Sequence, residues 1–245
     1  MFKKIISFFL VLTLLSVSSF SSIYAAELID KQSIVDNLST ILMNRNNKLI
    51  AYIKNNPNKN VITAVDAFME AHKIDVSKYK VKDFQNKALV NIVKINDNTT
   101  IGFNSDGSFA VDTLTSKPIL NQVSSASLMT TQYKWAANDR IRYSIWGYKL
   151  YRIHVESNFG YNGVSAWYAG GLMGYYERYF GPGGIWQVSN WDTGTTVVNG
   201  GEYCRAYARG NFHYGIEYQG IGWVIQDIYE DVRVSVNYDG TAYRN

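Results

Sequence analysis

Cysteine is almost missing from this chain, and its scarcity limits how the fold can be held together. The 245 residues include a single cysteine, Cys204. One cysteine cannot form an intrachain disulfide, so packing and hydrogen bonds must stabilise the fold. Cys204 lies on the apolar side of an alternating segment. This position favours a small buried hydrophobic residue over a reactive thiol.

A large excess of charge of either sign is missing as well. The chain has 24 lysines and arginines against 20 aspartates and glutamates, a formal net charge of +4 at pH 7. Loss of Lys3 and Lys4 with an N-terminal leader would halve that excess. Phosphate backbones demand a clearly basic face, so we expect no nucleic acid partner.

A long hydrophobic run occurs only at the N-terminus. The chain starts MFKK, continues with an apolar run over 5–17, and then becomes small and polar up to Ala25 and Ala26. This order is typical of a secretory signal peptide, and the run is shorter than the about 20 apolar residues of a membrane-spanning helix. We expect residues 1–26 to be removed and the mature chain to be secreted, extracellular and without a transmembrane span, as in exported bacterial proteins. An uncleaved membrane anchor is the alternative.

The composition changes abruptly near residue 134. All six tryptophans, 15 of 19 tyrosines and 17 of 19 glycines lie in 134–245. The basic residues also switch, from mostly lysine before this point to mostly arginine after it. The change predicts two domains, 27–114 and 134–245, joined by a polar, serine-rich linker at 115–133.

The first domain has the pattern of an α+β unit. Apolar residues at steps of three and four predict helices over Leu28–Lys54 and Val61–His72. Alternating runs with turn residues between them then predict three strands over Ala88–Ile95, Thr99–Asn104 and Ser108–Leu114. Two helices followed by a β-meander favour a structural role, as a spacer, a pro-region or a small partner-binding domain.

The second domain has the pattern of an all-β unit. Short alternating runs are separated by glycine-rich turns, and one turn is expected at Asp192-Thr193-Gly194. A last edge strand is expected at Thr241–Arg244, after Asp239-Gly240. Many short strands at this spacing predict an antiparallel β-sandwich or a barrel-like fold. The chain has no fixed-period repeat, which argues against a propeller or a solenoid.

The stretch Gly200–Tyr238 has the clearest alternation. One parity of its first run is apolar: Cys204, Ala206, Ala208 and Phe212. The other parity is polar or aromatic: Arg205, Tyr207, Arg209, Asn211 and His213. A strand sends alternate side chains to opposite faces, so this run predicts one packed face and one face for solvent or ligand.

A second strand shows the same division. There the polar parity holds Arg152, His154 and Glu156. This strand and the first run of Gly200–Tyr238 would be neighbours if they pair in one sheet. One face of that sheet would then carry the candidate ligand-binding residues Arg152, His154, Glu156, Arg205, Arg209, His213 and Glu217. A solvated face with opposed charge pairs is the alternative.

Aromatic residues provide another candidate contact. Tyr175, Tyr176 and Tyr179 lie in the glycine-rich segment Ala169–Phe180 and are candidates for contact with lipid or a protein partner. Core packing is the alternative.

Motifs for catalysis are missing. A thiol hydrolase would pair Cys204 with His154 or His213, but Cys204 and His213 point to opposite faces unless a bulge at Gly210 reverses the parity. The histidines have no metal-ligand spacing, and no pair of carboxylates is singled out for glycoside hydrolysis. We therefore predict no catalytic residue, no metal and no cofactor.

The sequence favours a non-enzymatic extracellular module that binds a cell-surface, carbohydrate or protein ligand through its arginine-rich and aromatic face. A secreted membrane-active toxin or antimicrobial protein is one alternative. An extracellular hydrolase is the other.

Overall fold

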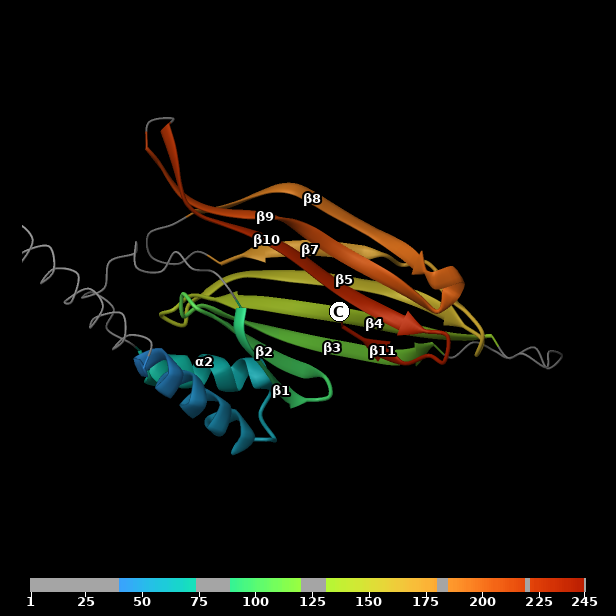
Figure 1. The fold of residues 1–245 in the computed structure, drawn as a ribbon, viewed down its shortest axis with the longest axis horizontal. Coiled ribbons are helices and arrows are strands. Elements are labelled where there is room, and N and C mark those ends of the chain that lie inside the picture. Colours follow the sequence, from blue (N-terminus) through green and yellow to red (C-terminus); the bar gives the residue numbers. More distant parts are fainter. Residues whose placement is uncertain (1–39, 74–88, 120–130, 180–184, 219–220, 245) are drawn as a thin grey trace, which may run out of the picture.

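The computed structural model describes residues 40–73, 89–119, 131–179, 185–218 and 221–244. The expected signal peptide and the start of the first expected helix lie outside these residues. Two helices come first in the chain and are followed by the strands of two antiparallel sheets (Figure 1). This confirms the expectation of helices followed by a β-sandwich-like fold. The strands form two separate sheets and not a closed barrel.

The helices cover one face of the first sheet. The first helix includes residues 40–54, and helix α2 spans Val61–Ala71, within one residue of its expected end. The side chain of Asn60 caps α2 by accepting hydrogen bonds from the first-turn amides. Apolar residues of both helices then pack on strands β1 to β4 in a buried cluster that includes Leu49, Phe68, Phe109 and Tyr143. Neither described helix is long and apolar enough to cross a membrane.

Seven strands form the first sheet. They are β1 Leu89–Asn96, β2 Thr99–Asn104, β3 Phe109–Ile119, β4 Gln132–Tyr143, β5 Lys149–Tyr161, β6 Ala166–Tyr168 and β7 Met173–Arg178. The order is β1-β2-β3-β4-β5-β6, and β7 also pairs with β5. The expected meander is therefore the first half of a larger sheet.

This sheet continues across the expected linker. β3 pairs with β4 from Phe109 opposite Tyr143 to Ile119 opposite Tyr133. Residues 115–119 and 132–133, which we expected in the linker, are thus strand residues. The end of β3 resembles a linker because it extends beyond the helices and exposes its polar side chains.

Four strands form the second sheet, in the order β11-β10-β9-β8. They are β8 Ile185–Val198, β9 Tyr203–Tyr218, β10 Ile221–Asn237 and β11 Ala242–Tyr243. The last confirms the expected edge strand at the C-terminus.

β8 is one strand, so the turn expected at Asp192-Thr193-Gly194 is wrong. Gly194 lies opposite Tyr207, and a Cβ on Gly194 would overlap the Tyr207 side chain. This glycine therefore permits close packing of a tyrosine ring and does not mark a turn. The irregularity in β8 comes earlier, where Asn190 and Trp191 together face Gly210 in a β-bulge.

The main core lies between the two sheets. Strands β5, β9 and β10 each contribute alternate, inward-facing side chains to it. The resulting buried cluster includes Ile153, Cys204, Ala206, Phe212 and Val234. The molecule thus has three layers: helices, the first sheet and the second sheet (Figure 1). The outward face of the second sheet is the side remote from the helices.

Candidate functional site

The sequence-predicted ligand-binding residues do not meet on one face. β5 lies in the first sheet and β9 in the second, and their inward parities pack against each other in the core. Arg152, His154 and Glu156 therefore point away from the β9 residues, and the expected gathering of all seven is wrong. Glu217 pairs through its backbone with Gly222, but its side chain lies outside the described part of the structure.

His154 is held in a polar cluster on β4, β5 and β7, on the face of the first sheet that points away from the second sheet. Its Nδ1 lies 2.9 Å from Asp139 Oδ1, and its Nε2 lies 3.1 Å from Glu156 Oε2. The Tyr175 ring stacks on the imidazole at 4.8 Å, and Arg152 Nε donates to Asp139 at 2.7 Å. Burial alone would lower the pKa of His154, but the bonds and charges of Asp139 and Glu156 outweigh it and raise this pKa. Both ring nitrogens are engaged by carboxylates, so the cluster is a structural ion-pair group.

The three candidate contact tyrosines do not form one exposed patch. Tyr175 stacks on His154, and the Tyr179 hydroxyl donates to Glu177 at 3.2 Å. Tyr176 turns inward, with its ring 4.8 Å from that of Trp191. Tyr175 and Tyr176 lie in β7, Met173–Arg178, which pairs with β5, and Tyr179 directly follows this strand.

Cys204 is buried in the core, as expected. Burial raises the pKa of its thiol to about 11, so the thiol is protonated at neutral pH. The bulge opposite Gly210 lies in β8, while the pairing of β9 with β10 stays regular from Cys204 to His213. The parity is not reversed, and His213 points to the opposite face from Cys204. A thiol nucleophile is therefore excluded for this pair.

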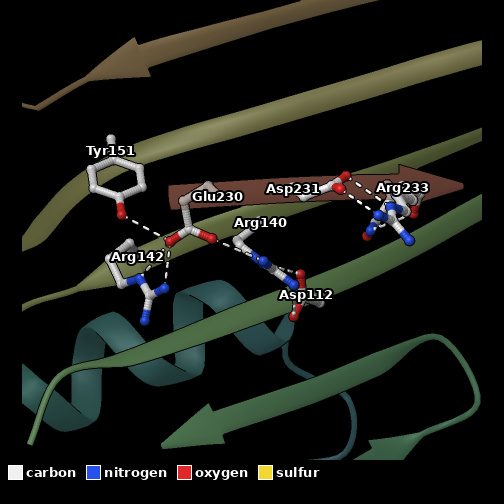
Figure 2. A network of polar contacts seen from close by, with 8 residues as sticks. Asp112, Arg140, Arg142, Tyr151, Glu230, Asp231 and Arg233 are labelled. Atoms are coloured by element: carbon white, nitrogen blue, oxygen red, sulfur yellow. Dashed lines mark hydrogen bonds and ion pairs between the residues drawn. The ribbon is translucent and has the colours of Figure 1, made fainter. Parts of the chain in front are cut away.

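A buried charge network that the sequence did not reveal joins the two sheets (Figure 2). Glu230 of β10 is 2% exposed. Its carboxylate accepts hydrogen bonds from Arg140 Nη1 at 2.9 Å, Arg142 Nε at 3.0 Å and the Tyr151 hydroxyl at 2.8 Å. Arg140 also donates to Asp112 of β3 at 2.7 Å. Two guanidinium groups and two carboxylates balance in charge, as buried ions must.

The charges in this network fix the ionisation of Glu230. Burial alone would raise the pKa of Glu230, but Arg142 and Arg140 outweigh it and lower this pKa to about 2. The described hydrogen-bond donors to this carboxylate are three side chains of the first sheet. We interpret the network as a clamp between β10 and the first sheet.

The outward face of the second sheet carries the alternating residues predicted for β9. We call Tyr203, Arg205, Tyr207 and Arg209 the tyrosine–arginine row. The Arg205 guanidinium lies 5.2 Å from the Tyr203 ring centroid, and the Arg209 guanidinium lies 4.6 Å from that of Tyr207. These are cation–π distances, so each arginine is held on the ring two residues before it.

Neighbouring strands complete this face. Arg209 pairs with Asp192 of β8 at 2.7 Å, and Arg233 of β10 donates from Nε to Asp231 at 2.8 Å. Tyr229 of β10 is 60% exposed. The face is open to solvent at these positions, since the Arg209 side chain is also 43% exposed.

His213 lies farther along the same face, in a different environment from His154. Its Nε2 lies 2.6 Å from Ser189 Oγ of β8, and its Nδ1 lies 3.3 Å from Asp227 Oδ1 of β10. Sequence reasoning named His213 but not this pairing with Ser189 and Asp227, because the pairing depends on the order of three strands in the sheet.

No known protein family matches the sequence, and no curated protein or solved structure matches it either. Within the described residues, no group of three or more His, Cys, Asp or Glu side chains is arranged to hold a metal ion. The site must therefore be interpreted from its own chemistry.

Proposed function

We propose that this protein is a secreted recognition module that binds a carbohydrate along the tyrosine–arginine row. The observation that carries the proposal is the alternation of rings and guanidinium groups along Tyr203–Arg209, with each arginine packed on a ring. Aromatic rings offer flat apolar faces on which sugar rings stack. Guanidinium groups offer fixed, planar donors for sugar hydroxyls.

The charge of the face favours a neutral ligand. Arg205, Arg209 and Arg233 are matched in number by Asp192, Asp227 and Asp231 on β8 and β10. An anionic polymer needs a net positive surface, and these described arginines and aspartates do not supply one. A neutral saccharide needs donors, acceptors and stacking surfaces without net charge, and the row with its aspartates supplies all three.

The length of the row favours an extended ligand. Six residue steps separate Tyr203 from Arg209 on one continuous strand, which corresponds to about 20 Å. The row is an open surface, because it follows the outward face of a sheet. Such a surface suits several consecutive sugar units better than one enclosed sugar.

Binding to a panel of neutral polysaccharides, measured by calorimetry and affinity electrophoresis, tests the proposal. We expect Tyr207→Ala and Arg205→Ala to weaken binding by about tenfold or more, because each removes about 1.4 kcal/mol or more of stacking and hydrogen bonding. Melting temperatures should change little, since these side chains lie outside the core.

Tyr148→Ala is the matched control. Tyr148 is a tyrosine that is 42% exposed, in the turn between β4 and β5 of the other sheet. This variant should bind like the unmodified protein. Equal binding by the Tyr148 and Tyr207 variants would rule out the row as the binding surface.

A further inference from the structure

We propose that Ser189, His213 and Asp227 form a serine hydrolase site on the outward face of the second sheet, acting on O-acyl esters. The site lies on the same face as the tyrosine–arginine row, so the choice of an acylated saccharide as substrate rests on the proposed function. The hydrolytic chemistry itself rests on the three side chains alone.

The three residues have the connectivity that serine activation requires. Ser189 Oγ lies 2.6 Å from His213 Nε2, within hydrogen-bond distance of a general base. Asp227 Oδ1 lies 3.3 Å from the other ring nitrogen, Nδ1, where a carboxylate fixes the tautomer and stabilises the imidazolium. His154 differs from His213, because a carboxylate lies at each of its ring nitrogens, where His213 has one carboxylate and one serine hydroxyl.

The register of three neighbouring strands produces this geometry. Asp227 of β10 pairs directly with His213 of β9, and Gln187 of β8 lies opposite His213 on the other side. Ser189 is therefore the diagonal neighbour of His213, one step along the same face. Ser189 is exposed, so an acyl group can reach its hydroxyl from solvent.

The β-bulge lies directly after Ser189. Asn190 has a φ of 53°. Asn190 and Trp191 of β8 together stand opposite a single residue of β9, Gly210. The ring of Trp191 packs 4.8 Å from that of Tyr176 at the core, which anchors the bulge. A bulge removes its extra residue from the ladder and often re-aims side chains beside reactive sites. We assign the amide of Asn190, the residue after the nucleophile, as the donor to the oxyanion.

The reaction balances with water as the only co-reactant. Ser189 Oγ attacks the acyl carbon while its proton moves to His213 Nε2. The bond from carbon to the alcohol oxygen then breaks, and that oxygen takes the proton from Nε2. Water next gives a proton to Nε2 and attacks the acyl carbon, and Ser189 leaves with that proton. The products are a carboxylic acid and an alcohol.

The row leads towards this site. His213 lies four residues beyond Arg209 on β9, a separation of about 13 Å along one face. A polymer stacked on the row would therefore present its substituents to Ser189. An O-acyl group on a saccharide is the substituent that this chemistry can remove.

Labelling with an alkyl fluorophosphonate provides the first test. This probe transfers its phosphonyl group to an activated serine with loss of fluoride, and mass spectrometry of the digested full-length protein locates the label. We expect a single label on Ser189, absent from Ser189→Ala and unchanged in Ser116→Ala, which removes an exposed serine of β3. An unlabelled protein, or equal labelling of the Ser189→Ala variant, would overturn the proposal.

Hydrolysis of p-nitrophenyl acetate provides the second test. Ser189→Ala should abolish turnover, and His213→Gln should lower it about a hundredfold or more, because the general base is lost. Asp227→Asn should lower it by a smaller factor, since this aspartate side chain is 59% exposed and its charge is screened. All three positions lie on the surface face, so unchanged melting temperatures should accompany these losses. Turnover that survives His213→Gln would contradict the assigned base.

These small probes separate the two proposals. Neither the fluorophosphonate nor p-nitrophenyl acetate needs a polysaccharide, so both report on Ser189 even if the row binds no sugar. Conversely, polysaccharide binding without labelling would support the recognition module and reject the hydrolase site. Release of acetate from an acetylated polysaccharide, but not by Ser189→Ala, would support both.

Discussion

The two histidines of the β-sandwich show how the partners of an imidazole decide its role. His154 has a carboxylate at each ring nitrogen and is 6% exposed, so its environment favours the imidazolium cation. His213 has one carboxylate and one hydroxyl, so its two nitrogens face different chemistry. The first arrangement stabilises the fold, and the second can move a proton.

The raised pKa of His154 predicts a pH-dependent stability. Such a histidine stabilises the folded state fully below its unfolded pKa of about 6.5, and the contribution is lost as the pH rises through the higher folded value. We therefore expect the free energy of unfolding, measured with urea, to fall as the pH increases above about 6.5. His154→Gln should remove this part of the pH dependence.

A histidine outside the cluster serves as the control for this measurement. His72 lies at the exposed C-terminal end of α2, where its Nδ1 contacts the Phe68 carbonyl. His72→Gln should keep the decline in stability above about pH 6.5. If the His154→Gln variant declines as steeply as the unmodified protein, the cluster does not carry the effect.

Strand β10 places adjacent acidic residues in opposite environments. Glu230 points between the sheets and is bound by Arg140, Arg142 and Tyr151, whereas Asp231 points outward and pairs with Arg233 (Figure 2). The strand geometry alone makes the difference, since neighbouring residues face opposite sides. One strand thus contributes both to the interior clamp and to the outer face.

This contrast predicts very different costs for the same chemical change. Glu230→Gln leaves two buried arginines with one carboxylate, and we expect a loss of about 3–5 kcal/mol in the free energy of unfolding. Asp231→Asn removes a partly exposed pair and should cost within about 1 kcal/mol. Chemical denaturation of both variants measures the difference. Similar costs for the two variants would show that the Glu230 network is not a clamp.

The first sheet joins the two halves of the chain. β3 pairs with β4 along its full length, and Asp112 of β3 completes the charge balance of Arg140 on β4. Ile141 and Tyr143 of β4 pack under the helices. The change of composition near residue 134 therefore falls inside a continuous sheet.

A truncated chain tests whether the second half folds alone. We expect a 134–245 fragment to lack the cooperative thermal transition of the 27–245 chain, because it exposes the edge of β4 and leaves Arg140 without Asp112. Circular dichroism during heating measures both. A transition in the fragment at the same temperature as in the longer chain would support two independent domains.

Local periodicity determined much of the fold. The spacing in 61–72 predicted α2 and the alternation in 99–104 predicted β2. The parity of β9 correctly placed Cys204 in the core and Arg205, Arg209 and His213 on the opposite face. These features depend on neighbours within one element, which a sequence displays directly. The composition of β9 likewise identified the face that we propose for binding.

The partner of each strand face depends on how the strands are ordered in space, and the sequence does not display that order. The sequence did not show that Arg140 and Arg142 of β4 face Glu230 across the core. Nor could it show that β5 and β9 belong to different sheets, or that Ser189 and Asp227 flank His213. Strand order joins residues that are distant in the chain, and the periodicity of each strand carries no information about its neighbours. The sequence therefore determined the parity of the strands, and their pairing determined the clamp and the candidate site.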